Sequence, residues 1–260
     1  MKTFDSVMIR VENEIAVVSL NRPAAGNSFD GEFFREVTEA IYLCEADERV
    51  KVILLTGEGK NFSVGGDIQQ MSSFDFLTYD VSILSGEMSG AVRKCKKPVV
   101  AVVNGVAAGA GCILALACDF RIMTEKSMLM TAFSNVGLCG DTGAVYHLYH
   151  LVGLAKTIEM MAFSEPIKGE EALRLGLATK LVKEEALMEE EAFAFAEKLK
   201  NRPLAAIAMQ KKMYWDTFYH DYEAYCRMEA ELFVKSAKTE DHVEAVTAFL
   251  QKRKPAFKGK

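Results

Sequence analysis

The feature that most limits the fold is an uncharged segment between Lys97 and Asp119, which reads PVVAVVNGVAAGAGCILALAC. By length alone this segment would suit a membrane span. Asn104 and three glycines interrupt it, however, and divide it into a short β-rich piece and a helix of small residues. We therefore predict a buried strand, a turn and a buried helix within a soluble domain, and no membrane span.

This segment lies within a longer series of predicted strands and helices. Strands that alternate with helices are joined by crossover connections, so the series predicts an α/β fold with a parallel or mixed sheet. From Gly140 onward the pattern is mainly helical and strand-like pieces become scarce. The predicted strands are 6–11, 15–20, 51–57, 99–105 and 119–123, and the predicted helices lie within 29–47, 82–96, 109–118, 172–178, 184–200 and 203–249.

The helical pattern suggests a division of the chain near residue 200. We predict a β/α core at 1–200 and a helical C-terminal region at 201–260. That region carries aromatic side chains on its helices, and sixty residues are too few to bury them alone. We expect it to pack on the core and on neighbouring subunits; packing on its own core alone is the alternative.

Charge and cysteine usage exclude several classes of function. The net charge is −5, so no basic field exists to hold nucleic acid. The six cysteines lack CxxC and metal-ligand spacing, which favours reduced buried thiols in a cytoplasmic protein, and the charged N-terminus lacks the apolar stretch of an export signal. His147 and His150 share a predicted helix without a third ligand, so we predict no metal site.

Two glycine clusters, VGGD (64–67) and GVAAGAG (105–111), each follow a predicted buried strand. The order GxGxxG, a downstream acidic residue for a ribose and a GK[ST] motif are all missing, which argues against nucleotide binding. Glycines let backbone N–H groups approach a ligand, and N–H groups from both clusters could converge on one carbonyl oxygen. Tight turns or close helix–strand contacts are the alternative explanation of each cluster.

Motifs spread over nearly the whole chain agree in order and spacing with one known family. They are LNRP (20–23), FSVGGD (62–67), NGVAAGAG (104–111), ACDFRI (117–122), FSNVGLCGDTGA (133–144), EALRLGLA (171–178) and the ending AFLQKRKPAFKGK (248–260). Together they resemble the crotonase superfamily, the enoyl-CoA hydratases and isomerases. The resemblance implies a crotonase-type spiral of β–β–α turns with a helical C-terminal trimerisation region, assembled as a homotrimer or a dimer of trimers.

The resemblance also implies a set of binding residues. The substrate would be an acyl-CoA thioester, with no other cofactor because coenzyme A is part of the substrate. The thioester oxygen would lie between the backbone N–H groups of Gly66 and Ala110. Coenzyme A would be held by residues of the LNRP loop, the first glycine cluster and the tail, the last commonly on a neighbouring subunit: Arg22, Val64, Gly65, Asp67, Phe249 and Lys252.

The chain departs from the hydratases of this family at two positions. Those hydratases use two glutamates, which fall here on Ile113 and Phe133. Neither side chain can transfer a proton, and adding water to an enoyl double bond needs groups that activate the water and deliver the α-proton. The chain offers Asp141 instead, where several subfamilies place an aspartate. The pattern is closest to the ring-epoxyphenylacetyl-CoA isomerase of phenylacetate degradation.

We therefore predict an enoyl-CoA isomerase-like reaction. Asp141 would take a proton from one carbon and return it two carbons along, while the oxyanion hole stabilises the dienolate. Apolar neighbours would raise the pKa of Asp141 and make it a better base. Glu87, on the predicted helix 82–96, is a reserve acid/base. The predicted acyl-pocket residues are Phe74, Ile113, Phe133, Val136 and Leu138.

Several alternatives stay open at this point. The chain could be an enoyl-CoA hydratase with non-standard catalytic residues, or a catalytically weak acyl-CoA-binding homologue. An aspartate-nucleophile dehalogenase or hydrolase is disfavoured, because the histidine and tryptophan that aromatic-acyl-CoA dehalogenases need correspond to Gly86 and Phe133. Asp141 or Thr142 could also serve only as a cap that accepts the free N–H groups of the following helix.

Overall fold

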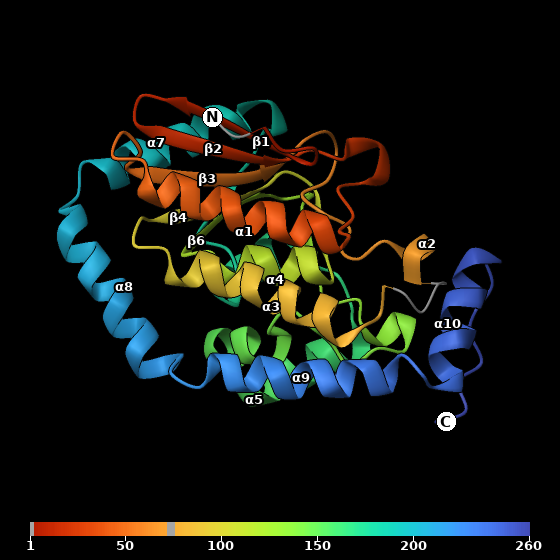
Figure 1. Ribbon diagram of the computed structural model, residues 1–260. Helices are drawn as coiled ribbons and strands as arrows, with labels where there is room; N and C mark the ends of the chain where they lie inside the picture. The colour runs from red at the N-terminus through yellow and green to blue at the C-terminus, as the bar shows by residue number, and fades with distance from the viewer. Residues whose placement is uncertain (1–2, 72–75) are drawn as a thin grey trace.

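The computed structural model describes residues 3–71 and 76–260 and contains two sheets (Figure 1). In the larger sheet β1 is antiparallel to β2, and every later pair of neighbours is parallel. Its strand order is β1 (Val7–Glu12), β2 (Ile15–Leu20), β3 (Val52–Gly57), β4 (Val99–Val103), β6 (Phe120–Thr124), β9 (Lys180–Val182). The smaller sheet has the order β5 (Val106–Ala108), β7 (Met128–Met130), β8 (Ile167–Lys168).

Helices cover both faces of the larger sheet, and further helices form the C-terminal region. They are α1 (Gly31–Ala46), α2 (Ile68–Met71), α3 (Tyr79–Lys94), α4 (Ala110–Ala117), α5 (Ala144–Phe163), α6 (Gly169–Arg174), α7 (Met188–Lys200), α8 (Leu204–Phe218), α9 (Tyr222–Ser236) and α10 (Glu240–Leu250). Short 3₁₀ turns are η1 (Pro23–Ala25), η2 (Ser134–Val136) and η3 (Glu185–Leu187). This is the mixed α/β fold that the alternating pattern predicted.

The central strands are buried on both sides, so successive residues belong to different hydrophobic cores. Val18 and Leu55 point to the core that contains α1, α3 and α4, whereas Val17 and Leu54 point to the core that contains α7. This alternation follows from the period of two along a strand. It also explains why these strands read as continuous apolar runs in the sequence.

The uncharged segment folds as predicted into a buried strand, a turn and a buried helix. It forms β4, a turn at Asn104 and Gly105, β5 and then α4, whose eight residues are all buried. Across residues 3–71 and 76–260, no helix is both long and apolar enough to cross a membrane. The lack of charge in this segment therefore reflects burial inside the protein.

Several short strands were not predicted. β5, β7, β8 and β9 have two or three residues each, too few to show an alternating pattern. β8 and β9 also interrupt the region after Gly140 that reads as helical, and β9 pairs with β6 at the edge of the larger sheet. Pairing partners far away in the sequence, rather than local pattern, place these strands.

The C-terminal helices return to the core of their own chain. α8 runs along one side of the molecule, and α9 then packs along α3 (Figure 1). Phe233 of α9 belongs to the main hydrophobic core. An aromatic cluster joins α5, α8 and α9 through Tyr146, Trp215 and Tyr222. The boundary near residue 200 and the contacts between subunits stay predictions.

The first test concerns the close packing of α4. A Cβ atom at Gly111 would lie 2.6 Å from both the Cβ atom and the carbonyl oxygen of Ser63. We expect Gly111→Ala to lower the free energy of unfolding by about 1–3 kcal/mol, because the added methyl group forces backbone atoms apart. Denaturant unfolding measures this change. Gly31→Ala, whose Cβ would make only an ordinary contact 3.6 Å from Val81, is the matched control; equal effects would contradict the prediction.

Candidate active site

The two glycine clusters pack directly against each other. The Ser63 N–H donates to the carbonyl of Val106 at 3.1 Å, and the Ala108 N–H donates to the carbonyl of Ser63 at 2.9 Å. A Cβ atom at Gly65 would lie only 2.7 Å from the Ala108 carbonyl oxygen. The close-contact explanation of the glycines is therefore correct, and the same contact brings residues 64–66 beside the start of α4.

Gly66 and Ala110 line one pocket. Ala110 is the first residue of α4, after Gly109 at a φ of 51°, so its N–H has no intrahelical partner. No hydrogen bond joins the N–H of Gly66 or Ala110 to another of the described residues. A Cβ atom at Gly66 would lie 2.5 Å from the Met71 side chain. Two backbone donors thus remain available at the pocket, as an oxyanion hole requires.

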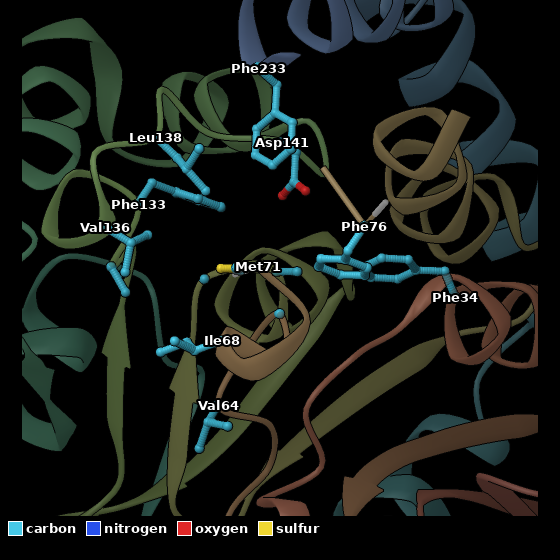
Figure 2. Close-up of a pocket in the computed structure, with 14 residues that line it drawn as sticks. Phe34, Val64, Ile68, Met71, Phe76, Phe133, Val136, Leu138, Asp141 and Phe233 are labelled. Carbon is cyan, nitrogen blue, oxygen red and sulfur yellow. The ribbon is translucent and has the colours of Figure 1, made fainter. Parts of the chain in front are cut away.

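The pocket is almost entirely apolar. It encloses about 530 Å³, including its open mouth, and aromatic and aliphatic side chains form most of its wall. Figure 2 shows the Asp141 carboxylate pointing into this space, with Phe233 and Leu138 beside it and Phe76 at the other side. Among the described residues that line the pocket, Asp141 is the one with an ionisable side chain.

Burial changes the acidity of Asp141. The residue is 8 % exposed, and loss of solvent raises the pKa of its carboxyl group from 3.8 to about 6. Hydrogen bonds from the hydroxyls of Thr142 and Ser85 oppose this rise, and the Thr142 hydroxyl lies 2.7 Å from Asp141 Oδ1. Asp141 can therefore accept and release a proton near neutral pH, as a general base must.

Asp141 does not cap the helix that follows it. The position before α5 is Gly143, and the Gly143 and Ala144 N–H groups donate to the two carboxylate oxygens of Glu229, at 2.7 and 3.0 Å. Glu229 comes from α9. Capping by the Asp141 or Thr142 side chain, which the sequence left open, is thus wrong, because a distant carboxylate occupies that position.

The predicted acyl-pocket residues are only partly brought together. Phe133, Val136 and Leu138 line the pocket around Asp141 (Figure 2). Ile113 is fully buried in the hydrophobic core and is not among the residues that line the pocket. Its assignment to the acyl pocket stays a prediction. Phe74 lies outside the described residues.

Glu87 does not reach this pocket. It is exposed on α3 and lines a separate groove with Tyr79, Lys94 and Trp215. The buried face of α3 instead contributes Ser85 to the surroundings of Asp141. Within one chain the structure therefore gives Glu87 no contact with the site, and its choice as a reserve acid/base is not supported.

The predicted coenzyme A residues fall into two groups. Arg22 lies near the first glycine cluster, with its guanidinium 3.9 Å from the Asp67 carboxylate and 2.8 Å from Asp30. Phe249 and Lys252 are exposed at the end of α10, outside the pocket. Their binding roles stay predictions.

Several residues around the pocket were not predicted from the sequence. Phe34 of α1 and Phe233 of α9 form part of the pocket wall, and Glu229 caps α5. The sequence marks Phe233 only as one of the aromatic residues on the C-terminal helices. Glu229 lies in an ordinary charged helical stretch that carries no local signal. Only the fold brings these residues to the site.

Comparisons with known proteins agree with this geometry. The profile of the family described as enoyl-CoA hydratase/isomerase matches residues 10–260. The chain is 33% identical to a probable enoyl-CoA hydratase of Bacillus subtilis, over 98% of this chain and 99% of that protein. It is 32% identical to a trans-2-decenoyl-[acyl-carrier-protein] isomerase of Streptococcus mutans, over 99% of both chains.

The chain belongs to the enoyl-CoA hydratase/isomerase family. A solved enoyl-CoA hydratase from Mycobacterium avium subsp. paratuberculosis has a similar structure, with a TM-score of 0.89 and 28% identity, over 98% of this chain and 100% of that one. The crotonase-type fold expected from the motifs is thereby confirmed. Family membership identifies an enzyme of the enoyl-CoA hydratase/isomerase family and does not by itself separate hydration from isomerisation.

The second test concerns the energetic cost of the buried carboxylate. Because the folded protein raises the pKa of Asp141 from 3.8 to about 6, ionisation destabilises the fold; the cost is absent below pH 4 and complete above about pH 7. Two pKa units correspond to about 3 kcal/mol. We expect Asp141→Asn to raise the free energy of unfolding by about this amount at pH 8, and by about half as much at pH 5.

Denaturant unfolding at the two pH values measures this difference. Asp5→Asn, at an exposed position, is the control and should change stability little at either pH. If Asp141→Asn raised the free energy of unfolding equally at both pH values, ionisation of the buried carboxyl group could not be the cause.

Proposed function

We propose that this protein shifts the double bond of an enoyl-CoA thioester, with Asp141 as the single acid/base. The observation that carries the proposal is the composition of the pocket wall. Of the described lining residues, Asp141 alone can ionise, and it lies in the same pocket as the N–H groups of Gly66 and Ala110. A one-carboxylate site suits a reaction in which one group removes and returns the same proton.

The proposed reaction balances without water. The thioester oxygen accepts hydrogen bonds from the two N–H groups, which stabilise the negative charge that develops on it. Ionised Asp141 removes a proton from C2 of a 3-enoyl thioester, and the electrons delocalise into a dienolate. Protonated Asp141 then returns the proton to C4, which leaves a double bond between C2 and C3. The carboxylate is regenerated and the product has the mass of the substrate.

Water addition is the second candidate. The observation that favours it is the naming of relatives, since most of those compared are described as hydratases. The two glutamate positions of the family's hydratases are occupied by Ile113 and Phe133, neither of which can activate water. The Streptococcus mutans relative, named as an isomerase, supports the double-bond shift.

Other parts of the function are proposed at a coarser level. The apolar wall favours a hydrocarbon acyl group over one with charged or hydroxyl substituents, because such groups would lose hydration without finding partners. Coenzyme A is proposed as the carrier, with Arg22 and the first glycine cluster beside the mouth of the site. Assembly as a trimer or dimer of trimers, a cytoplasmic location and a place in phenylacetate degradation stay predictions.

The third test compares wild type with Asp141→Asn on 3-hexenoyl-CoA and 2-hexenoyl-CoA. We expect wild type to interconvert the two without a gain of the mass of water, and the variant to lose at least 10²-fold in kcat because it has no base. Product mass and chromatography provide the measurement. Asp5→Asn serves again as control. Water addition that survives in Asp141→Asn would refute the proposal.

The fourth test is the pH dependence of the wild-type reaction. The base must be ionised, and burial holds the pKa of Asp141 at about 6. We therefore expect kcat/KM for 3-hexenoyl-CoA to rise with pH through a midpoint near 6. Initial rates between pH 5 and 8 measure this. A rate that is flat or falls over that range would count against Asp141 as the base.

A further inference from the structure

The turn that carries Asp141 has an unusual backbone. Gly140 has a φ of 110°, Thr142 of 64° and Gly143 of 77°, so three of the four residues 140–143 have a positive φ. For Thr142, a β-branched residue, this conformation is rare and costs on the order of 1–3 kcal/mol. Such a turn persists only where surrounding contacts hold it in place.

Part of that support comes from α3. The Thr142 N–H donates to the Ser85 hydroxyl at 3.1 Å, and the Ser89 hydroxyl donates to the Thr142 carbonyl at 2.7 Å. Both serines are buried. These bonds fix the middle of the turn but leave the N–H groups of its last residues, at the start of α5, without partners from α3.

The remaining support comes from α9. The carboxylate of Glu229 accepts hydrogen bonds from the N–H groups of Gly143 and Ala144. The Tyr225 hydroxyl donates a further hydrogen bond to its Oε1 atom at 2.8 Å. A carboxylate at this position also interacts favourably with the positive end of the helix dipole. Glu229 is 5 % exposed and does not line the pocket, and its hydrogen bonds go to the backbone of the turn that carries Asp141.

The same helix takes part in the pocket itself. Phe233 follows Glu229 by four residues, so the two side chains leave one face of α9 one turn apart. Phe233 contacts the cavity beside Asp141 (Figure 2), while Glu229 holds the backbone behind Asp141. One face of α9 thus lines the pocket beside Asp141 and also holds the backbone that follows Asp141.

We propose that Glu229 is a positioning residue, which holds the turn 140–143 so that the Asp141 carboxylate points into the pocket. This inference rests on the proposed role of Asp141 as the base. A small side chain at the position before the helix would provide an ordinary local cap. The chain instead uses a buried carboxylate 86 residues away, which couples the order of the C-terminal region to the geometry of the site.

Charge provides a second link between the two carboxyl groups. Burial, and next the negative charge of Asp141, raise the pKa of Glu229 to about 7, whereas its hydrogen bonds from Gly143, Tyr225 and Ala144 lower it. Asp141, with a pKa of about 6, ionises before Glu229, so the charge of Asp141 acts on Glu229 and keeps it protonated to a higher pH. The titratable groups that face Glu229 are Asp141 and Cys139 from the turn, and Tyr222, Tyr225 and Cys226 from its own helix; none is a cation.

The experiment compares Glu229→Gln with Glu231→Gln, which alters an exposed glutamate on the same helix. With 3-hexenoyl-CoA we expect Glu229→Gln to lower kcat 10- to 100-fold, because a misplaced base loses alignment. KM should change less than about threefold, since Glu229 does not contact the pocket. The midpoint of the kcat/KM profile should stay near that of wild type, because Glu229, with a pKa of about 7, is mostly neutral where Asp141 titrates.

A purely structural cap would behave differently. Replacing such a cap would lower the melting temperature and leave kcat per folded enzyme unchanged, and this result would overturn the proposal. If Glu229→Gln does not fold, Tyr225→Phe decides the matter, since it removes one donor to the carboxylate and should lower kcat about two- to fivefold. An unchanged kcat there would overturn the proposal.

The Asp141→Asn variant separates the two proposals. If it is inactive while Glu229→Gln behaves like Glu231→Gln, the positioning role fails and the proposed function stands. If Asp141→Asn retains full activity, the proposed function fails, and the role of Glu229 fails with it.

Discussion

Close contact between two backbone segments is the constraint on which the site depends. Residues 63–66 and the β5–α4 junction share hydrogen bonds, and Gly65 and Gly111 leave no space for a side chain between them. This contact brings Gly66 beside Ala110 at the start of α4. Two N–H groups without partners in the described part of the chain thus come to line one pocket. The uncharged β4–α4 segment makes the contact possible, because small apolar residues allow dense packing there.

Around this contact the protein holds two buried carboxylates, which oppose its stability. Burial raises the pKa of both Asp141 and Glu229, so each destabilises the fold when ionised. The cost is partly offset at Glu229 by two backbone N–H groups and a tyrosine hydroxyl. Asp141 accepts hydrogen bonds from neighbouring hydroxyls, and its carboxylate faces an apolar cavity. Such an unfavourable arrangement is typical of catalytic groups.

The sequence predicted much of this arrangement. The apolar runs of β2, β3 and β4 and the small residues of α4 gave the correct elements, since both follow from local periodicity. The spacing of the two glycine clusters and of Asp141 led to the correct family and to the residues that share the pocket. Ile113, predicted for the acyl pocket, is fully buried and does not line the cavity, and its position along the chain did not indicate this depth of burial. Glu87 was predicted as a reserve acid/base because of its place on the predicted helix 82–96, but its side chain is exposed and lines a separate groove.

The sequence by itself determined the α/β class, the family and the identity of the carboxylate, because each depends on residues that are close together or on motifs of fixed spacing. Only the tertiary structure decided what surrounds that carboxylate. By its place before α5, Asp141 could cap that helix. In the structure Glu229 of α9 accepts these hydrogen bonds instead, from 86 residues further along the chain. Phe34 and Phe233 reach the pocket in the same way, from α1 and α9. Burial and long-range hydrogen bonds arise only when distant segments pack together, so no local pattern can specify them.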